Sequence, residues 1–142
     1  MLSLGSGPGI SEDRLKRCTS GIDCKDYITA LVADILSSYS LPNIDKKLTV
    51  EPIIMDIEVV TSLGLIINEL VTNSLKYAFP ENSTNNYIEI TLHKKQNNVV
   101  LEVIDNGIGI TENDNKKESL GLSLVNDLCY KINGQITFDS LT

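Results

Sequence analysis

Three polar side chains, Glu69, Asn73 and Lys76, recur at intervals of four and three residues within a largely apolar segment. In an α-helix, positions i, i+4 and i+7 lie within about 60° of one another, so the three would share one edge. A carboxamide oxygen suits Mg²⁺, an ammonium can hold phosphate oxygens, and a carboxylate can polarise a nucleophile or its water. The spacing alone also fits a solvated helix face with an incidental ion pair, and it favours that interpretation.

A second candidate is the glycine-containing segment that begins at Asp105, directly after a predicted strand. The carboxylate of Asp105 could accept a hydrogen bond from an exocyclic amine. Gly107 and Gly109 allow positive φ or a close approach of the backbone to a flat ligand. The run Asp-Asn-Gly is also ordinary turn chemistry. No helix begins directly behind Gly109, so the segment is not a Rossmann fingerprint.

A third candidate is the beginning of the last predicted helix, at Ser119, Leu120, Gly121 and Leu122. Free backbone N–H groups at a helix N-terminus form an anion site. Ser119 could cap this helix, and Gly121 leaves space for a phosphate. A plain N-cap explains the same residues equally well.

The elements that must position these residues follow from hydrophobic periodicity and from turn residues. Apolar residues from Ile28 to Leu36 predict a first helix, with Asp23 as its cap and Pro42 beyond its end. Further helices are predicted at 58–78 and 120–132, and strands at 47–50, 87–93, 99–104 and 135–138. The strands at 87–93 and 99–104 form a hairpin. Helices and strands without regular βαβ alternation predict an α+β, two-layer domain.

The chain has 142 residues and a net charge of −7, which bounds its organisation and its partners. One domain is expected at this length. The acidity argues against a nucleic-acid groove and against a basic helix on a membrane surface. Residues 1–21 are rich in Gly, Ser and Pro and are expected to be a linker or the tail of a preceding domain. Residues 22–142 are expected to form the folded domain.

Taken in order, the three candidate segments resemble three sequence boxes of the GHKL ATPases, and specifically of sensor histidine kinases. Residues 68–78 look like the N box, residues 105–109 resemble the first glycine box, and residues 119–122 resemble the second. The run Ser-Leu-Gly-Leu, in place of the commoner Gly-Leu-Gly-Leu, is similar to two-component kinases with a variant dimerisation domain. The resemblance extends over about residues 23–138 and is specific because all three boxes occur together.

The resemblance implies a Bergerat fold, in which a mixed sheet is covered by helices on one face and ATP lies between helices and loops. Asp105 would hold the adenine amine, Asn73 would coordinate Mg²⁺, and Glu69 would assist phosphotransfer. The other residues implied to bind ATP are Lys76, Tyr77, Gly107, Gly109, Ser119, Leu120, Gly121 and Leu122. Residues 111–118 would form a short ATP lid.

The function implied is that of a catalytic ATPase domain of a two-component protein histidine kinase. It would bind Mg-ATP and transfer the γ-phosphate to a histidine on a separate dimerisation domain, and it would serve a response regulator indirectly. His93 is expected to be an exposed strand-end residue rather than the acceptor. The location implied is the cytoplasm, either alone or as part of a membrane-bound sensor, with no membrane contact by the domain.

Two alternatives remain open at this point. One is an ATP-binding or regulatory module without turnover, and the other is a serine kinase of the anti-sigma type. The chain ends at Thr142, where the family's sheet would continue, so we expect an excised domain or a truncated product without a final strand.

Overall fold

The computed structural model describes residues 2–4, 21–39, 44–80, 84–108 and 119–138. Gly109 and the expected lid at 111–118 lie outside these residues. Five strands form a mixed sheet in the order β3-β5-β6-β1-β7. Their bounds are Ile44–Val50 for β3, Asn86–Lys95 for β5, Asn98–Asp105 for β6, Leu2–Leu4 for β1 and Ile136–Phe138 for β7. The pairing of β3 with β5 is parallel and the others are antiparallel. Two short strands, β2 (Ile22–Asp23) and β4 (Ile54–Met55), pair separately.

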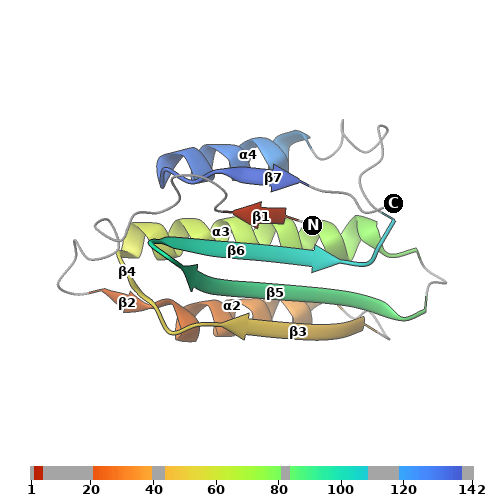
Figure 1. Ribbon diagram of the computed structural model, residues 1–142. Coiled ribbons are helices and arrows are strands. Elements are labelled where there is room, and N and C mark those ends of the chain that lie inside the picture. Colours follow the sequence, from red (N-terminus) through yellow and green to blue (C-terminus); the bar gives the residue numbers. More distant parts are fainter. Residues whose placement is uncertain (1, 5–20, 40–43, 81–83, 109–118, 139–142) are drawn as a thin grey trace.

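Three helices, α2 (Cys24–Ser38), α3 (Ile57–Asn73) and α4 (Ser119–Lys131), lie on one side of this sheet (Figure 1). Along β5 burial alternates, because successive side chains of a strand point to opposite faces. Ile88, Ile90 and Leu92 are buried in the core. The expected α+β, two-layer architecture with a mixed sheet is therefore confirmed.

The caps of the first two helices follow local sequence chemistry. The Asp23 carboxylate accepts from the backbone N–H of Lys25 at 3.0 Å, as the predicted N-cap of α2. Asp56 caps α3 in the same way through the N–H of Glu58, at 3.2 Å. The predicted hairpin is also present, with Gln96 at φ 55° in its turn.

The N-terminal residues differ from the sequence prediction. The expected linker at 1–21 includes a strand, because Leu2–Leu4 form β1 between β6 and β7. Its register places Leu2 opposite Val103 on one side and opposite Phe138 on the other. Unpaired backbone groups along β6 and β7 provide the partners for this strand. Three residues are too few for local periodicity to reveal it.

The second helix also differs from the sequence prediction near its C-terminus. The sequence predicts one helix over 58–78, but α3 ends at Asn73 and a π-helix, η1 (Ser74–Ala78), follows. A π-helix is wound with i→i+5 hydrogen bonds and often occurs at functional sites. Lys76 and Tyr77 lie on this wider turn, so the predicted α-helical alignment of Lys76 with Glu69 and Asn73 is wrong in detail.

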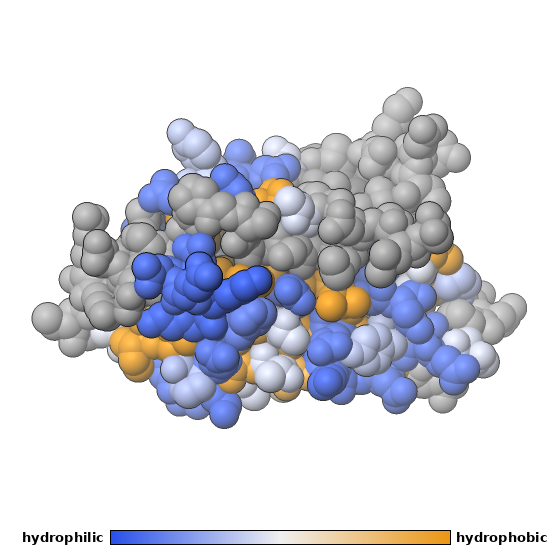
Figure 2. Space-filling view, in the orientation of Figure 1, coloured by the Kyte–Doolittle hydropathy of each residue, from blue (hydrophilic) through white to orange (hydrophobic). Residues whose placement is uncertain are grey.

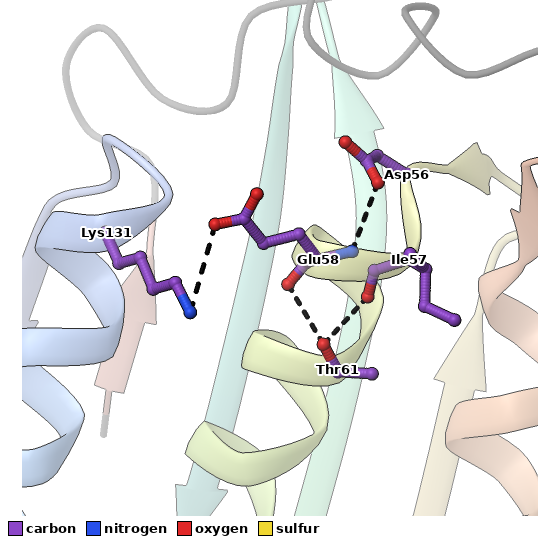
Figure 3. A network of polar contacts seen from close by, with 5 residues as sticks. All are labelled: Asp56, Ile57, Glu58, Thr61 and Lys131. Atoms are coloured by element: carbon purple, nitrogen blue, oxygen red, sulfur yellow. Dashed lines mark hydrogen bonds and ion pairs between the residues drawn. The ribbon is translucent and has the colours of Figure 1, made fainter.

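An ion pair joins the end of α4 to the start of α3 and indicates the relative direction of the two helices (Figure 3). Lys131, at the end of α4, lies 3.9 Å from the carboxylate of Glu58, at the start of α3. Both side chains are about half exposed, so the pair contributes at most about 1 kcal/mol. Its position shows that the two helices are antiparallel. The start of α4 therefore lies toward the end of α3 that bears Asn73.

The opposite face of the sheet carries polar side chains among apolar ones (Figure 2). Glu89 lies 3.7 Å from the ammonium of Lys47 and accepts a hydrogen bond from the hydroxyl of Tyr87. That hydrogen bond raises the pKa of Tyr87 above its ordinary value.

Among the described residues, no helix is both long and apolar enough to cross a membrane.

Candidate functional site

The Asp105 carboxylate is held at both oxygens where β6 ends. Its Oδ2 accepts from the hydroxyl of Ser74 at 2.8 Å, and its Oδ1 accepts from the N–H of Gly107 at 3.0 Å. Ser74 is the first residue of η1, so this contact joins the end of the α3–η1 segment to the end of β6. Two segments that the sequence suggested separately are thus brought into contact.

Gly107 lies against the end of η1 with no space for a side chain. A Cβ placed on Gly107 would lie 2.3 Å from the carbonyl oxygen of Ala78 and 2.5 Å from its Cβ. The next residue, Ile108, donates its N–H to the same carbonyl at 2.9 Å. The close approach explains why glycine is needed here and anchors the segment after β6 to η1.

We expect Gly107→Ala to displace this segment, because a methyl group at 2.3 Å from a backbone oxygen cannot be accommodated without backbone movement. Overpacking of this kind typically costs about 1–3 kcal/mol in the free energy of unfolding. Urea denaturation would measure this cost. Gly134→Ala, in the turn between α4 and β7, is the comparison variant. An unchanged midpoint for Gly107→Ala would contradict the contact.

Asn106, between Asp105 and Gly107, holds the segment from the other side. Its side-chain Oδ1 accepts from the N–H of Tyr87 at 2.7 Å, and its Nδ2 donates to the carbonyl of Asn85 at 2.7 Å. Its own N–H donates to the carbonyl of Tyr87 at 3.2 Å. From the sequence, Asn106 is expected only to be part of a turn. Its side chain instead joins the end of β6 to the start of β5.

The polar residues of the second helix divide between α3 and η1. Glu69 and Asn73 are half-buried in the last turns of α3, where i and i+4 side chains are neighbours. Lys76 is exposed, and Tyr77 retains 43% of its surface. The Asn73 side chain makes no capping hydrogen bond to η1.

A magnesium ion fits the donor chemistry of this region. The Asn73 amide oxygen and the Glu69 carboxylate are hard oxygen donors, and Mg²⁺ commonly takes one or two protein ligands together with waters and phosphate oxygens. In the described part of the chain, no three His, Cys, Asp or Glu side chains gather to form a complete metal cage.

The third predicted segment opens a helix, because α4 begins at Ser119. Figure 1 shows the start of α4 at the same end of the molecule as the end of β6 and the end of the α3–η1 segment. Nothing in the described residues reports on the side chains at 119–122, so the roles of Ser119, Leu120, Gly121 and Leu122 stay predictions. The role of Gly109 also stays a prediction.

Ser74 is the functional candidate that sequence reasoning missed. At α-helical spacing Ser74 falls on the same face as Ile67, Leu70 and Val71, which are buried, and it is itself 9% exposed. A hydroxyl at a core position was the available signal, because buried polar groups need a partner. Here that partner is Asp105.

A separate hollow of about 190 Å³ lies between α2 and the strands β3 and β5. It is lined mainly by apolar side chains, among them Val32, Leu36 and Leu48. Neither Asp105 nor Asn73 borders it. It is therefore distinct from the site at the end of β6.

Comparison with known proteins identifies the family. Residues 58–142 match the profile of the family described as histidine kinase-, DNA gyrase B-, and HSP90-like ATPases. The chain belongs to this ATPase family. The match begins in the first turn of α3 and includes every residue of the candidate site. The resemblance drawn from the three sequence boxes is thereby confirmed.

One curated relative of this chain is a sensor histidine kinase. The chain is 33% identical over 86 residues to the oxygen sensor histidine kinase NreB of Staphylococcus carnosus. That alignment includes 60% of this chain and 23% of NreB, so the chain spans about a quarter of that relative.

Solved structures of histidine kinases share the fold. The histidine kinase domain of the blue-light activated kinase EL346 from Erythrobacter litoralis aligns with a TM-score of 0.71 and 21% identity, over 84% of this chain and 58% of that one. The catalytic domain of histidine kinase ThkA aligns with a TM-score of 0.59 and 18% identity, over 82% of this chain and 91% of that one. At these identities the structures support the Bergerat fold alone.

Proposed function

We propose that this chain contains the ATP-binding catalytic domain of a two-component sensor histidine kinase, formed by residues 22–142 together with the β1 strand. It binds Mg-ATP and transfers the γ-phosphate to a histidine on a separate dimerisation domain. The observation that carries the proposal is the Asp105 carboxylate, fixed at the end of β6 against the segment that bears Asn73. Membership of the ATPase family supports it.

Nucleotide recognition would use charge and close backbone approach. The Asp105 carboxylate accepts a hydrogen bond from the exocyclic amine of adenine, and the contact of Gly107 with Ala78 holds the adjoining backbone in place beside the base. Lys76 contacts phosphate oxygens, and Tyr77 flanks the nucleotide. The N-terminus of α4 adds backbone N–H groups and the positive end of a helix dipole toward the phosphates.

Phosphoryl transfer depends mainly on positioning and on charge neutralisation. When bound, Mg²⁺ neutralises charge on the phosphate oxygens, and the Asn73 amide oxygen is the ligand we assign to it. The Glu69 carboxylate, one turn earlier on α3, can accept a hydrogen bond from the N–H of an incoming imidazole. That contact would leave the other ring nitrogen unprotonated and able to attack the γ-phosphorus.

The acceptor histidine belongs to another domain in this proposal. His93 lies within β5 opposite Val100, whereas Asp105 lies opposite Ile88, five positions away along β5. At about 3.3 Å per residue, the two places are roughly 16 Å apart along the sheet. His93 therefore lies toward the other end of the β5–β6 hairpin from the candidate site.

ATP binding should depend steeply on Mg²⁺, because the chain carries a net charge of −7 and Lys76 is the cation that we assign to the phosphates. Removing Mg²⁺ with EDTA is expected to lower the affinity for ATP by about tenfold or more, as the triphosphate would then meet this acidic protein without its counter-ion. Isothermal titration with and without Mg²⁺ measures the change. The affinity for adenosine, which has no phosphates, is the control and should stay constant. Equal ATP affinities in both buffers would contradict the magnesium role.

The proposed function is tested by mixing the chain with the histidine-bearing dimerisation domain of its parent kinase and ATP labelled at the γ-phosphate. Acid-labile label on the acceptor histidine is the expected result. Acid-stable label on a partner would instead indicate a serine kinase of the anti-sigma type. ATP binding without any transfer would support a nucleotide-binding module without turnover.

A further inference from the structure

We infer that Ser74 is a positioning residue whose hydroxyl orients the Asp105 carboxylate toward the exocyclic amine of the bound nucleotide. This inference rests on the proposed function. Ser74 lies within the N box, at 68–78, but is not among the residues that the family resemblance implies to bind ATP. The basis of the inference is the 2.8 Å hydrogen bond from the Ser74 hydroxyl to Oδ2 of Asp105.

The two hydrogen bonds to Asp105 differ in what they can fix. The N–H of Gly107 belongs to the same short segment, two residues away, and would move together with it. The Ser74 hydroxyl comes from a position 31 residues earlier and from a different element. It therefore holds the plane of the carboxylate relative to α3 and η1, which also carry Asn73 and Lys76.

Ser74 is itself held firmly. Its backbone N–H donates to the carbonyls of both Leu70 and Val71, at the junction of α3 and η1. Its side chain is buried, with 9% of its surface exposed, so water competes little for the hydroxyl. A donor with fixed backbone and restricted solvent access can orient an acceptor, because holding it costs little further conformational entropy.

The hydrogen bonds already made by the Asp105 carboxylate predict which ligand groups it can still bind. An ionised carboxylate is an acceptor only, with about four lone-pair sites, and two of them receive Ser74 and Gly107. The remaining sites require a donor. An exocyclic amine supplies such a donor. A carbonyl at the same position would instead place its oxygen lone pairs against those of the Asp105 carboxylate, which is repulsive. A purine without a substituent there makes no contact with the carboxylate.

The test compares ATP with purine riboside 5′-triphosphate, which lacks the exocyclic amine, by isothermal titration of the 142-residue chain with Mg²⁺. We expect Ser74→Ala to weaken ATP binding by about tenfold and to change the affinity for purine riboside triphosphate by less than about twofold. Ser74→Cys keeps nearly the same volume with a weaker donor and should behave like the alanine variant. Ser74→Thr retains the hydroxyl and should restore most of the ATP affinity.

The matched control is Ser62→Ala, which removes another buried serine hydroxyl, from the preceding helix α3, and should leave both affinities unchanged. Equal weakening of both ligands by Ser74→Cys would show a merely structural role and would overturn the inference. Unchanged ATP affinity in Ser74→Ala would overturn it as well. If the unmodified chain bound no ATP, the proposed function would fail first, and the inference with it. The outcomes are therefore distinguishable.

Discussion

Replacing Asp105 with asparagine is expected to lower the affinity for ATP by at least about a hundredfold. The substitution keeps the shape of the side chain but removes the charge and replaces one acceptor oxygen by an NH₂ donor. That donor would oppose the N–H of Gly107 or the adenine amine, both of which are donors, or would remove the acceptor of the Ser74 hydroxyl. Sites built around a hydrogen bond discriminate by large factors when that bond is lost.

Isothermal titration with Mg-ATP is the measurement for Asp105→Asn, with thermal denaturation to show that the variant is folded. The matched control is Asp34→Asn, which removes the same charge from the exposed surface of α2. It should bind ATP like the unmodified chain. If Asp105→Asn folded and bound ATP with unchanged affinity, Asp105 would not be the adenine-binding carboxylate.

Replacing Asn73 with aspartate is expected to abolish measurable binding of Mg-ATP under the same conditions. The new carboxylate would lie one helical turn from the Glu69 carboxylate, where we place the polyanionic triphosphate. The two carboxylates, at positions 69 and 73, would repel each other and would also repel the phosphates. The substitution also removes the amide N–H₂, which can donate to a phosphate oxygen.

Binding of adenosine distinguishes the effect of Asn73→Asp from that of Asp105→Asn. Adenosine lacks phosphates, so its binding should survive Asn73→Asp and be lost with Asp105→Asn. Asn97→Asp, in the β5–β6 turn at the far end of the hairpin from Asp105, adds the same charge away from the site and serves as the control. Undiminished Mg-ATP binding by Asn73→Asp would remove Asn73 from the metal and phosphate site.

A few contacts at the candidate site join the N box to the first glycine box, which is about 30 residues later in the chain. Ser74 and Gly107 both contact Asp105, and Ala78 contacts both Gly107 and Ile108. A displacement of η1 would therefore be transmitted to the Asp105 carboxylate. The π-helix is the structural reason, because its wide turn lies directly against the segment that follows β6.

Much of the fold could be predicted from local patterns. The Asp23 cap, the hairpin of β5 and β6 and the start of α4 at Ser119 depend on residues that are neighbours in the chain. Capping and turn chemistry are local interactions, and alternating burial along a strand follows from its two-residue period. The three boxes also pointed to the correct ATPase family, because residue types and their spacing are themselves features of the sequence.

The remaining features arise from contacts between segments that are distant in the chain. The strand at Leu2–Leu4 is stabilised by β6 and β7, about a hundred residues or more away, and three residues have no period of their own to detect. The switch from α3 to a π-helix at Ser74 accompanies contacts of η1 with Asp105, Gly107 and Ile108. Ser74 is spaced like a core residue, and its role as a donor to Asp105 exists only because the end of α3 packs beside the end of β6. Backbone pairing and the need to satisfy a buried hydroxyl, rather than local propensity, determine these features.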